Sequence, residues 1–257
     1  MLSMKMPGRA LLAALLLTSA CAPMGQMASP PPQGAPAPVP ADGVPVGEKG
    51  LVSAADPRAA EAGVDMLRLG GTATDAAIAT MLALTVVEPQ SSGIGGGGFL
   101  VLGDAAGKVE TVDGRETAPK AAGPQWFYVN GQPLPIIEAI PGGRSVGVPG
   151  NLRLAALAHA HHGKLAWRAL FQPAIQLARD GFVITPRLYA MLSRFPRTGA
   201  LDPQARAIYY GADGQPLPAG TVLGDPALAE TLEKIAAQGA DSFYAGDNAA
   251  TVAAKVG

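Results

Sequence analysis

The stretch that decides how this chain is organised is Glu88-Pro89-Gln90-Ser91-Ser92-Gly93-Ile94-Gly95-Gly96-Gly97-Gly98-Phe99-Leu100-Val101-Leu102. Its four consecutive glycines allow the backbone to take conformations that other residues avoid and to lie close against another segment or a ligand. Because glycine carries a high entropic cost on folding, a simple surface loop would rarely contain such a run. The stretch therefore predicts a place where backbone segments, or a backbone and a ligand, approach closely.

The same glycines match a dinucleotide-binding pattern, but in the wrong structural order. Gly93, Gly95 and Gly98 satisfy G-x-G-x-x-G, which requires a strand before the glycines and a helix after them. Here residues 75–84 are typical of a helix, and residues 99–102 are typical of a buried strand. A nucleotide site is therefore not expected. Glycines that let a helix pack on a sheet edge explain the run at least as well as direct ligand contact does.

Two helices are predicted upstream of the glycines. The first begins at Asp56-Pro57, an N-cap followed by proline, and ends at Gly70-Gly71, with an expected inner stripe of Ala60, Val64 and Leu67. The second begins near Thr74-Asp75 and must stop before Pro89. Since its body is rich in alanine and free of charge, we expect it to be buried against a sheet.

A β-hairpin is predicted directly downstream. Residues 99–102 and 108–112 flank a turn at residues 104–107. The first arm is apolar throughout and the second alternates, so the first is expected in the interior and the second nearer an edge. Arg115 follows the second arm, at a strand end where sheets commonly present chemistry.

The remainder of the chain is predicted to be mainly helical. Residues 119–149 are rich in proline and glycine and are expected to be irregular, with residues 146–150 as a short closing segment. Further helices are indicated by cap, proline and glycine signals. They are expected over residues 152–162, over residues 165–180 with a kink at Pro173, from residue 186 to about 194, from residue 225 to 239, and from Asp247 onward.

The first 20 residues are predicted to be a secretory signal peptide. They have a basic start, an apolar core too short to span a membrane, and small residues before Cys21, the only cysteine. Leu17 to Cys21 is similar to a relaxed bacterial lipobox, which would make Cys21 a lipidated N-terminus. Ordinary cleavage near Ala20 is the alternative. Residues 21–47 are rich in proline and alanine and are expected to form a disordered tether, so that the folded region comprises residues 48–257.

Composition and charge narrow the classes of partner. The formal net charge is -1, no basic stripe points to nucleic acid, and no later apolar run approaches a membrane-spanning length. A lipid anchor is therefore the only membrane contact expected. His159 and His162 share a helix face, but no cysteine or acidic residue lies within a turn. We therefore favour a solvated helix end over a metal site, and no cofactor is expected.

At residues 91–99, joined by Arg115-Glu116-Thr117-Ala118-Pro119, the chain resembles the γ-glutamyltranspeptidase family of N-terminal nucleophile hydrolases. The resemblance runs from about Leu51 to the end. Further matching pieces are residues 56–57, 70–77, 86–89, 146–150, 173–175, 178 and 181–182. All of them are similar to the large subunit of that family.

The resemblance implies the fold class and the site. The fold would be of the α/β (α+β) class, a four-layer αββα sandwich of which this chain supplies only the large-subunit portion. The family's nucleophile is a threonine that begins a small subunit, in a Thr-Thr-His or Thr-Ser-His context that this sequence does not contain. The resemblance therefore implies no catalytic residue in this chain and a small catalytic subunit as partner. Arg115 corresponds to the family's arginine that binds the α-carboxylate of the γ-glutamyl group. Pairing with Glu116 is the structural alternative for Arg115.

Two classes of function remain open at this point. In the first, the chain is the large-subunit part of an exported γ-glutamyltransferase or glutathione hydrolase. Such a periplasmic or outer-membrane lipoprotein would transfer the γ-glutamyl group of a small molecule to water or to an amino acid or peptide. In the second, it is a non-catalytic lipoprotein that keeps the scaffold for binding. An amidase similar to cephalosporin acylases is a further alternative.

Overall fold

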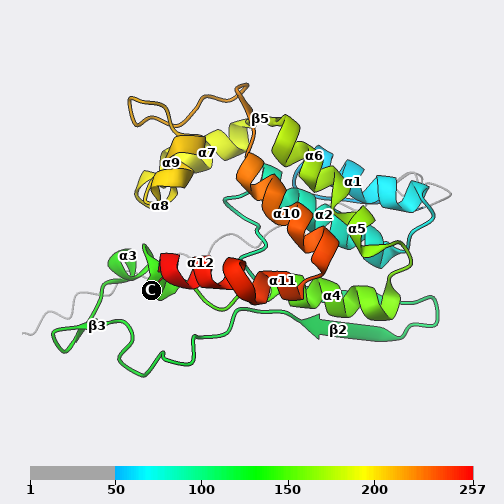
Figure 1. Cartoon of the computed structure of the whole chain (residues 1–257), viewed down its shortest axis with the longest axis horizontal. Coiled ribbons are helices and arrows are strands. Elements are labelled where there is room, and N and C mark those ends of the chain that lie inside the picture. Colours follow the sequence, from blue (N-terminus) through cyan, green and yellow to red (C-terminus); the bar gives the residue numbers. More distant parts are fainter. Residues whose placement is uncertain (1–49, 257) are drawn as a thin grey trace, which may run out of the picture. The chain divides into compact units, whose positions relative to one another are not determined.

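The structure is a computed structural model that describes residues 50–256. The predictions for the signal peptide, for Cys21 and for the tether up to residue 47 lie outside the described residues. Within them the chain forms twelve α-helices, one short 3₁₀ helix and six strands. Helices dominate (Figure 1).

The two helices before the glycine-rich stretch are confirmed. Helix α1 spans Pro57–Arg68, and its N-cap Asp56 accepts a hydrogen bond of 2.9 Å from the backbone N–H of Arg58. Helix α2 spans Ala73–Val87. It begins with a capping box, in which the side chains of Thr72 and Asp75 accept hydrogen bonds from each other's backbone N–H. Helix α1 therefore starts at the predicted cap, whereas α2 starts slightly before the predicted Thr74-Asp75, because Thr72 and not Thr74 is its N-cap.

The predicted inner stripe of α1 is wrong. The buried residues are Ala59, Ala62, Gly63 and Met66, whereas Ala60, Val64 and Leu67 are only partly buried. The reason is steric, because a Cβ on Gly63 would lie 2.8 Å from Val52 Cγ1 and 3.1 Å from the carbonyl oxygen of Ala76 on α2. The face with the smallest side chains turns inward because it permits the closest approach of the two helices.

Helix α2 is buried as predicted, but its principal neighbours are helices and not a sheet. It contacts α1, α4 (Asn151–His162), α5 (Trp167–Leu170) and α6 (Gln172–Asp180). The hydrophobic core is built around this helix and is rich in small aliphatic side chains. A helix that is apolar on every side needs cover on every side, and here other helices supply it.

The predicted hairpin is present. Strand β1 (Phe99–Gly103) pairs antiparallel with β2 (Val109–Asp113), from Phe99 opposite Asp113 to Gly103 opposite Val109. The prediction that the first arm is interior is wrong for the described residues, because Phe99 and Val101 are 63% and 66% exposed. Helix α4 contacts β2, and the face of the hairpin that carries Phe99, Val101 and Val109 is open.

Residues 119–149 are largely irregular, as predicted, but contain short elements. Strands β3 (Tyr128–Val129) and β4 (Gln132–Pro133) form a small hairpin around Asn130-Gly131, whose φ angles of 52° and 74° match the turn that Asn-Gly favours. Helix α3 (Ile136–Ala139) and the 3₁₀ helix η1 (Gly143–Ser145) follow. The Asn-Gly pair is a hairpin signal that our sequence reading overlooked.

The predicted kink at Pro173 is instead a break between two helices. Helix α5 ends at Leu170 and α6 begins at Gln172, with Pro173 in its first turn, where the missing N–H of proline is tolerated. The predicted helices at Pro186, Pro226 and Asp247 are confirmed. The remaining elements are α7 (Pro186–Arg194), α8 (Pro196–Gly199), α9 (Pro203–Tyr209), α10 (Pro226–Gln238), α11 (Asp241–Tyr244), α12 (Gly246–Val256) and the pair β5 (Phe182–Val183) and β6 (Val222–Leu223).

Candidate substrate-binding groove

The glycine-rich loop is held between the end of the β1–β2 hairpin and the start of α4. Gly114 N–H donates to the carbonyl oxygen of Gly98 at 2.9 Å. The backbone N–H groups of Gly150 and Asn151 donate to the carbonyl oxygen of Gly96 at 2.9 and 3.0 Å. The Asn151 side chain adds a 2.7 Å hydrogen bond to the carbonyl oxygen of Gly93. Hydrogen bonds of the loop's own backbone therefore join the start of α4 to the end of the β1–β2 hairpin.

Close backbone packing explains at least one of the glycines. A Cβ on Gly97 would lie 2.6 Å from the carbonyl oxygen of Gly114 and 2.7 Å from the backbone nitrogen of Glu116. Gly150 likewise lies directly against Gly114. In contrast, a Cβ on Gly95 would meet nothing within 4 Å. Close packing therefore explains why position 97 is a glycine. It does not explain Gly95, which faces open space.

These two positions give a matched pair of variants. Gly97→Ala should lower the free energy of unfolding by roughly 1–3 kcal/mol, because rigid backbone must move to admit the methyl group. Gly95→Ala should change it by less than about 1 kcal/mol in either direction. Urea denaturation followed by circular dichroism measures both. Equal losses in the two variants would contradict the packing explanation.

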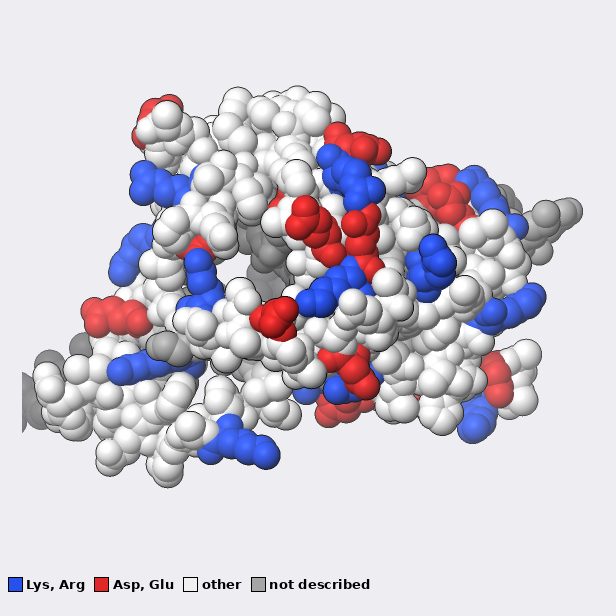
Figure 2. All heavy atoms as spheres, viewed as in Figure 1, with Lys and Arg blue, Asp and Glu red and all other residues white. Residues whose placement is uncertain are grey.

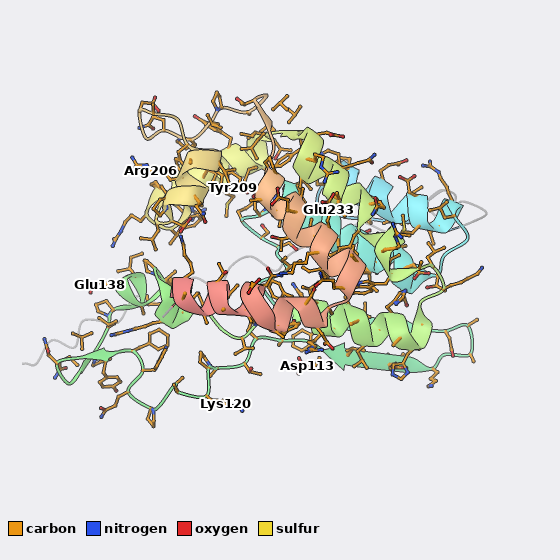
Figure 3. The ribbon with its side chains drawn as sticks, in the orientation of Figure 1. Asp113, Lys120, Glu138, Arg206, Tyr209 and Glu233 are labelled. Carbon is orange, nitrogen blue, oxygen red and sulfur yellow. The ribbon has the colours of Figure 1, made fainter. Side chains whose placement is uncertain are left out.

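Arg115 follows Asp113, the last residue of β2, by two positions. Figure 3 labels Asp113 at the end of β2 and Lys120 on the loop that continues from it. The backbone N–H of Arg115 donates to the Asp113 carboxylate at 2.8 Å. Its guanidinium Nε lies 3.0 Å from the Glu116 carboxylate, and its side chain is 58% exposed. The pairing with Glu116 that the sequence suggested is therefore present, and the guanidinium is still open to solvent. A solvated pair of this kind typically contributes at most about 1 kcal/mol.

Arg115 lines a groove of about 660 Å³. One wall is the segment from Arg115 to Tyr128 and the other is residues 144–147, and a bridge between Thr117 and Val148 joins the two. The volume is within the usual range for small-molecule sites. Arg144 also lines the groove. Arg144 was not among the site residues predicted from the sequence, because it lies in a segment expected to be irregular.

A second hollow, of about 420 Å³, lies between Pro89-Gln90 and helices α7 to α9. Its lining is mainly apolar, and none of the residues that line it carries a positive charge. Burial, with the nearby negative charge of Asp225, raises the pKa of Tyr209 to about 12. This hollow suits an apolar group and offers a carboxylate no charged partner.

His159 and His162 lie near the end of α4. Among the described residues no group of three or more His, Cys, Asp or Glu side chains is placed to share an ion. The prediction that these histidines lie at a solvated helix end needs correction, because the fold brings an acidic side chain close to each of His159 and His162. His159 Nε2 lies 2.8 Å from the carbonyl oxygen of Leu165 and 3.8 Å from buried Asp75, and His162 Nε2 lies 3.3 Å from Glu110.

The charges of the described surface are mixed. Figure 2 shows lysine and arginine side chains interspersed with acidic ones on the face in view. Over residues 50–256, no helix combines the length and the apolar character needed to cross a membrane.

Comparison with known proteins places this architecture in a class and then in a family. The fold is the α+β fold of N-terminal nucleophile hydrolases. The solved structure of γ-glutamyltranspeptidase from Helicobacter pylori matches 80% of this chain and 59% of its own, with a TM-score of 0.76 and 31% identity. The sequence model described as gamma-glutamyltranspeptidase matches residues 59–257. The chain therefore belongs to the γ-glutamyltranspeptidase family, in which it corresponds to the large-subunit part.

Curated relatives agree with this assignment. Scoloptoxin SSD14 from Scolopendra dehaani is 47% identical over 190 residues, which is 73% of this chain and 32% of that protein. The glutathione hydrolase proenzyme of Bacillus subtilis strain 168 is 40% identical over 215 residues, which is 81% of this chain and 36% of that protein. The chain thus spans about a third of the length of these relatives.

Proposed function

We propose that this chain is the large-subunit part of an exported γ-glutamyltransferase or glutathione hydrolase that cleaves γ-glutamyl amide bonds. The observation that carries the proposal is the solvent-open guanidinium of Arg115 in a groove of about 660 Å³. Membership of the family and the resemblance of relatives named glutathione hydrolase support it. The catalytic threonine would come from a small subunit.

Arg115 would hold the substrate by its α-carboxylate. A planar guanidinium can bind a carboxylate through two parallel hydrogen bonds, and Lys cannot reproduce this geometry. In the free protein Glu116 occupies the Nε edge of the guanidinium at 3.0 Å. Because this pair is solvated and weak, a substrate carboxylate can bind to the same guanidinium without a large cost.

In the proposed reaction the chain binds and orients, and the partner supplies the covalent chemistry. The threonine hydroxyl would attack the γ-carbonyl carbon, the amide C–N bond would break, and the amine would leave with a proton. Water or an acceptor amine would then take the γ-glutamyl group from the threonine ester. Holding the α-carboxylate fixes the γ-carbonyl relative to the nucleophile, which is a large part of the rate enhancement in such reactions.

The test compares the chain alone with the chain combined with its small subunit. The chain alone should release no aniline from a γ-glutamyl anilide, and the combination should release it. Release by the chain alone, in protein free of any second subunit, would contradict the proposed division of labour. Binding without release by the combination would support the non-catalytic lipoprotein. Preferential cleavage of an acylated β-lactam side chain would support the acylase-like amidase.

We also propose that the protein is anchored through a lipid on Cys21, on the strength of the signal-like residues 1–20 and the proline-rich residues that follow. Cys21→Ser should leave the protein without lipid and move it from the membrane fraction to the soluble fraction, because a single polypeptide tether has no affinity of its own for lipid. Cell fractionation followed by immunoblotting measures the shift. An unchanged distribution would contradict the lipobox interpretation.

A further inference from the structure

One buried polar side chain lies behind the groove without lining it. Asn151 is the first residue of α4, and only 8% of its surface is exposed. It belongs to the lining neither of the groove that contains Arg115 nor of the second hollow. A buried amide has to be hydrogen-bonded to offset its desolvation. The partners of Asn151 therefore indicate what this side chain does.

Asn151 is bonded to the glycine-rich loop (residues 93–98) at two points. Its side-chain Nδ2 donates to the carbonyl oxygen of Gly93 at 2.7 Å, and its backbone N–H donates to that of Gly96 at 3.0 Å. Since a carbonyl oxygen only accepts, the amide has to present its NH₂ group to Gly93, which fixes its orientation. Asparagine at a helix start often caps the helix, but α4 has no side-chain cap. The amide therefore binds the loop and not its own helix.

The loop in turn supports the segment that carries Arg115. Gly98 and Gly114 exchange backbone hydrogen bonds, with N···O distances of 3.3 Å from Gly98 N–H and 2.9 Å from Gly114 N–H. A Cβ on Gly97 would lie 2.7 Å from the backbone nitrogen of Glu116 and 2.8 Å from one of its carboxylate oxygens. Both chain neighbours of Arg115 therefore pack on the loop. A displacement of the loop would move the arginine with it.

We propose that Asn151 is a positioning residue for Arg115, and that it acts through the glycine-rich loop. This inference rests on the proposed function, in which the Arg115 guanidinium binds the α-carboxylate of the substrate. Asn151 itself would touch no substrate atom. Two parallel hydrogen bonds between a guanidinium and a carboxylate require a defined geometry, so a small shift of the backbone that carries the arginine weakens them.

The test uses the chain combined with its small subunit. Asn151→Asp keeps the shape of the side chain but puts an oxygen in place of the NH₂ group, so that two acceptors face each other at Gly93. KM for a γ-glutamyl anilide with a free α-carboxylate should rise about fivefold to tenfold, as expected for the loss of one hydrogen bond, with kcat little changed. Asn151→Ala removes the same donor without adding a charge and should raise KM in the same direction.

A double-mutant cycle separates positioning from a general effect on the fold. In an Arg115→Ala background, Asn151→Ala should change KM by less than about twofold, because the group that it positions is gone. A residue that only supports the fold would instead have the same effect in both backgrounds. An anilide with an amidated α-carboxylate gives a second comparison. Its KM should stay within about twofold in Asn151→Ala, since the arginine has no charge to bind. Circular dichroism checks that each variant is folded.

Asn248→Asp is the matched control. Asn248 on α12 donates from its side-chain Nδ2 to the carbonyl oxygen of Ser242 on α11 at 3.2 Å, so the control loses a bond of the same type at another place. Its KM should equal that of the wild type.

Three results would overturn the inference while anilide cleavage by the wild type still supported the proposed function. They are an equal rise in KM in both backgrounds of the cycle, no rise in either Asn151 variant, and failure of both Asn151 variants to fold. A wild-type combination that cleaves no γ-glutamyl anilide would overturn the proposed function and the inference together.

Discussion

Replacement of Asp75 by alanine is expected to lower the free energy of unfolding by about 3 kcal/mol. The Asp75 carboxylate is completely buried at the start of α2. It accepts hydrogen bonds from the backbone N–H groups of Thr72 at 2.8 Å, Lys164 at 3.0 Å and Leu165 at 3.3 Å. Alanine would leave three donors without this acceptor, and each buried unpaired group costs about 1–3 kcal/mol. Urea denaturation followed by circular dichroism measures the loss.

Two variants separate this effect from a general one. Asp75→Asn keeps the size of the side chain and one acceptor oxygen, so it should lose less than the alanine variant. Asp65→Ala removes an acidic side chain from the neighbouring helix α1. The interaction lost is a largely solvated ion pair, in which Asp65 lies 2.9 Å from Arg68. The effect of this substitution should be below about 1 kcal/mol. If Asp75→Ala cost no more than Asp65→Ala, the buried carboxylate would not be holding α2 and residues 164–165 together.

Arg115→Ala is expected to have the largest effect on activity in the protein combined with its small subunit. A charge-assisted hydrogen bond contributes about 1.5–3 kcal/mol, so loss of the guanidinium should weaken binding of γ-glutamyl substrates by about tenfold to a hundredfold. Arg115→Lys keeps the charge but loses the planar pair of donors, and should lose less. If the arginine holds ground and transition states equally, the loss appears in KM with kcat little changed. Steady-state kinetics with a γ-glutamyl anilide measure it.

A substrate with an amidated α-carboxylate is the control. It has no charge for Arg115 to bind, so the wild type should handle it poorly and the alanine variant should lose little more. Equal losses on the free-carboxylate and amidated substrates would mean that Arg115 supports the fold, through Asp113 and Glu116, and not the substrate.

Only part of the candidate site could be predicted from the sequence. Arg115 is a prediction from the family resemblance, and the described geometry adds its exposure, its pair with Glu116 and the groove it lines. Arg144 belongs to a segment that we predicted to be irregular. Its place opposite Arg115 depends on the bridge between Thr117 and Val148, which joins residues far apart in the sequence. Local patterns carry no information about such pairings.

The sequence by itself determined where most of the longer helices begin and end. Asp56 and Thr72 cap α1 and α2, and Gly181 and Gly239 end α6 and α10 with φ angles of 89° and 84°. These signals act within one or two turns, so no distant segment is needed to read them. The hairpin β1–β2 belongs to the same group, because its arms and its turn are adjacent in the chain.

Only the tertiary structure decided which faces are covered. The inner face of α1 is set by the close approach of Gly63 to α2, and it differs by one residue from the stripe that periodicity suggested. Helices, and not a sheet, surround α2. The open face of β1, with Phe99 and Val101, could not be inferred from an apolar run. In each case the outcome depends on the shape of a distant partner, and packing complementarity between distant segments is not written in the local pattern of either one.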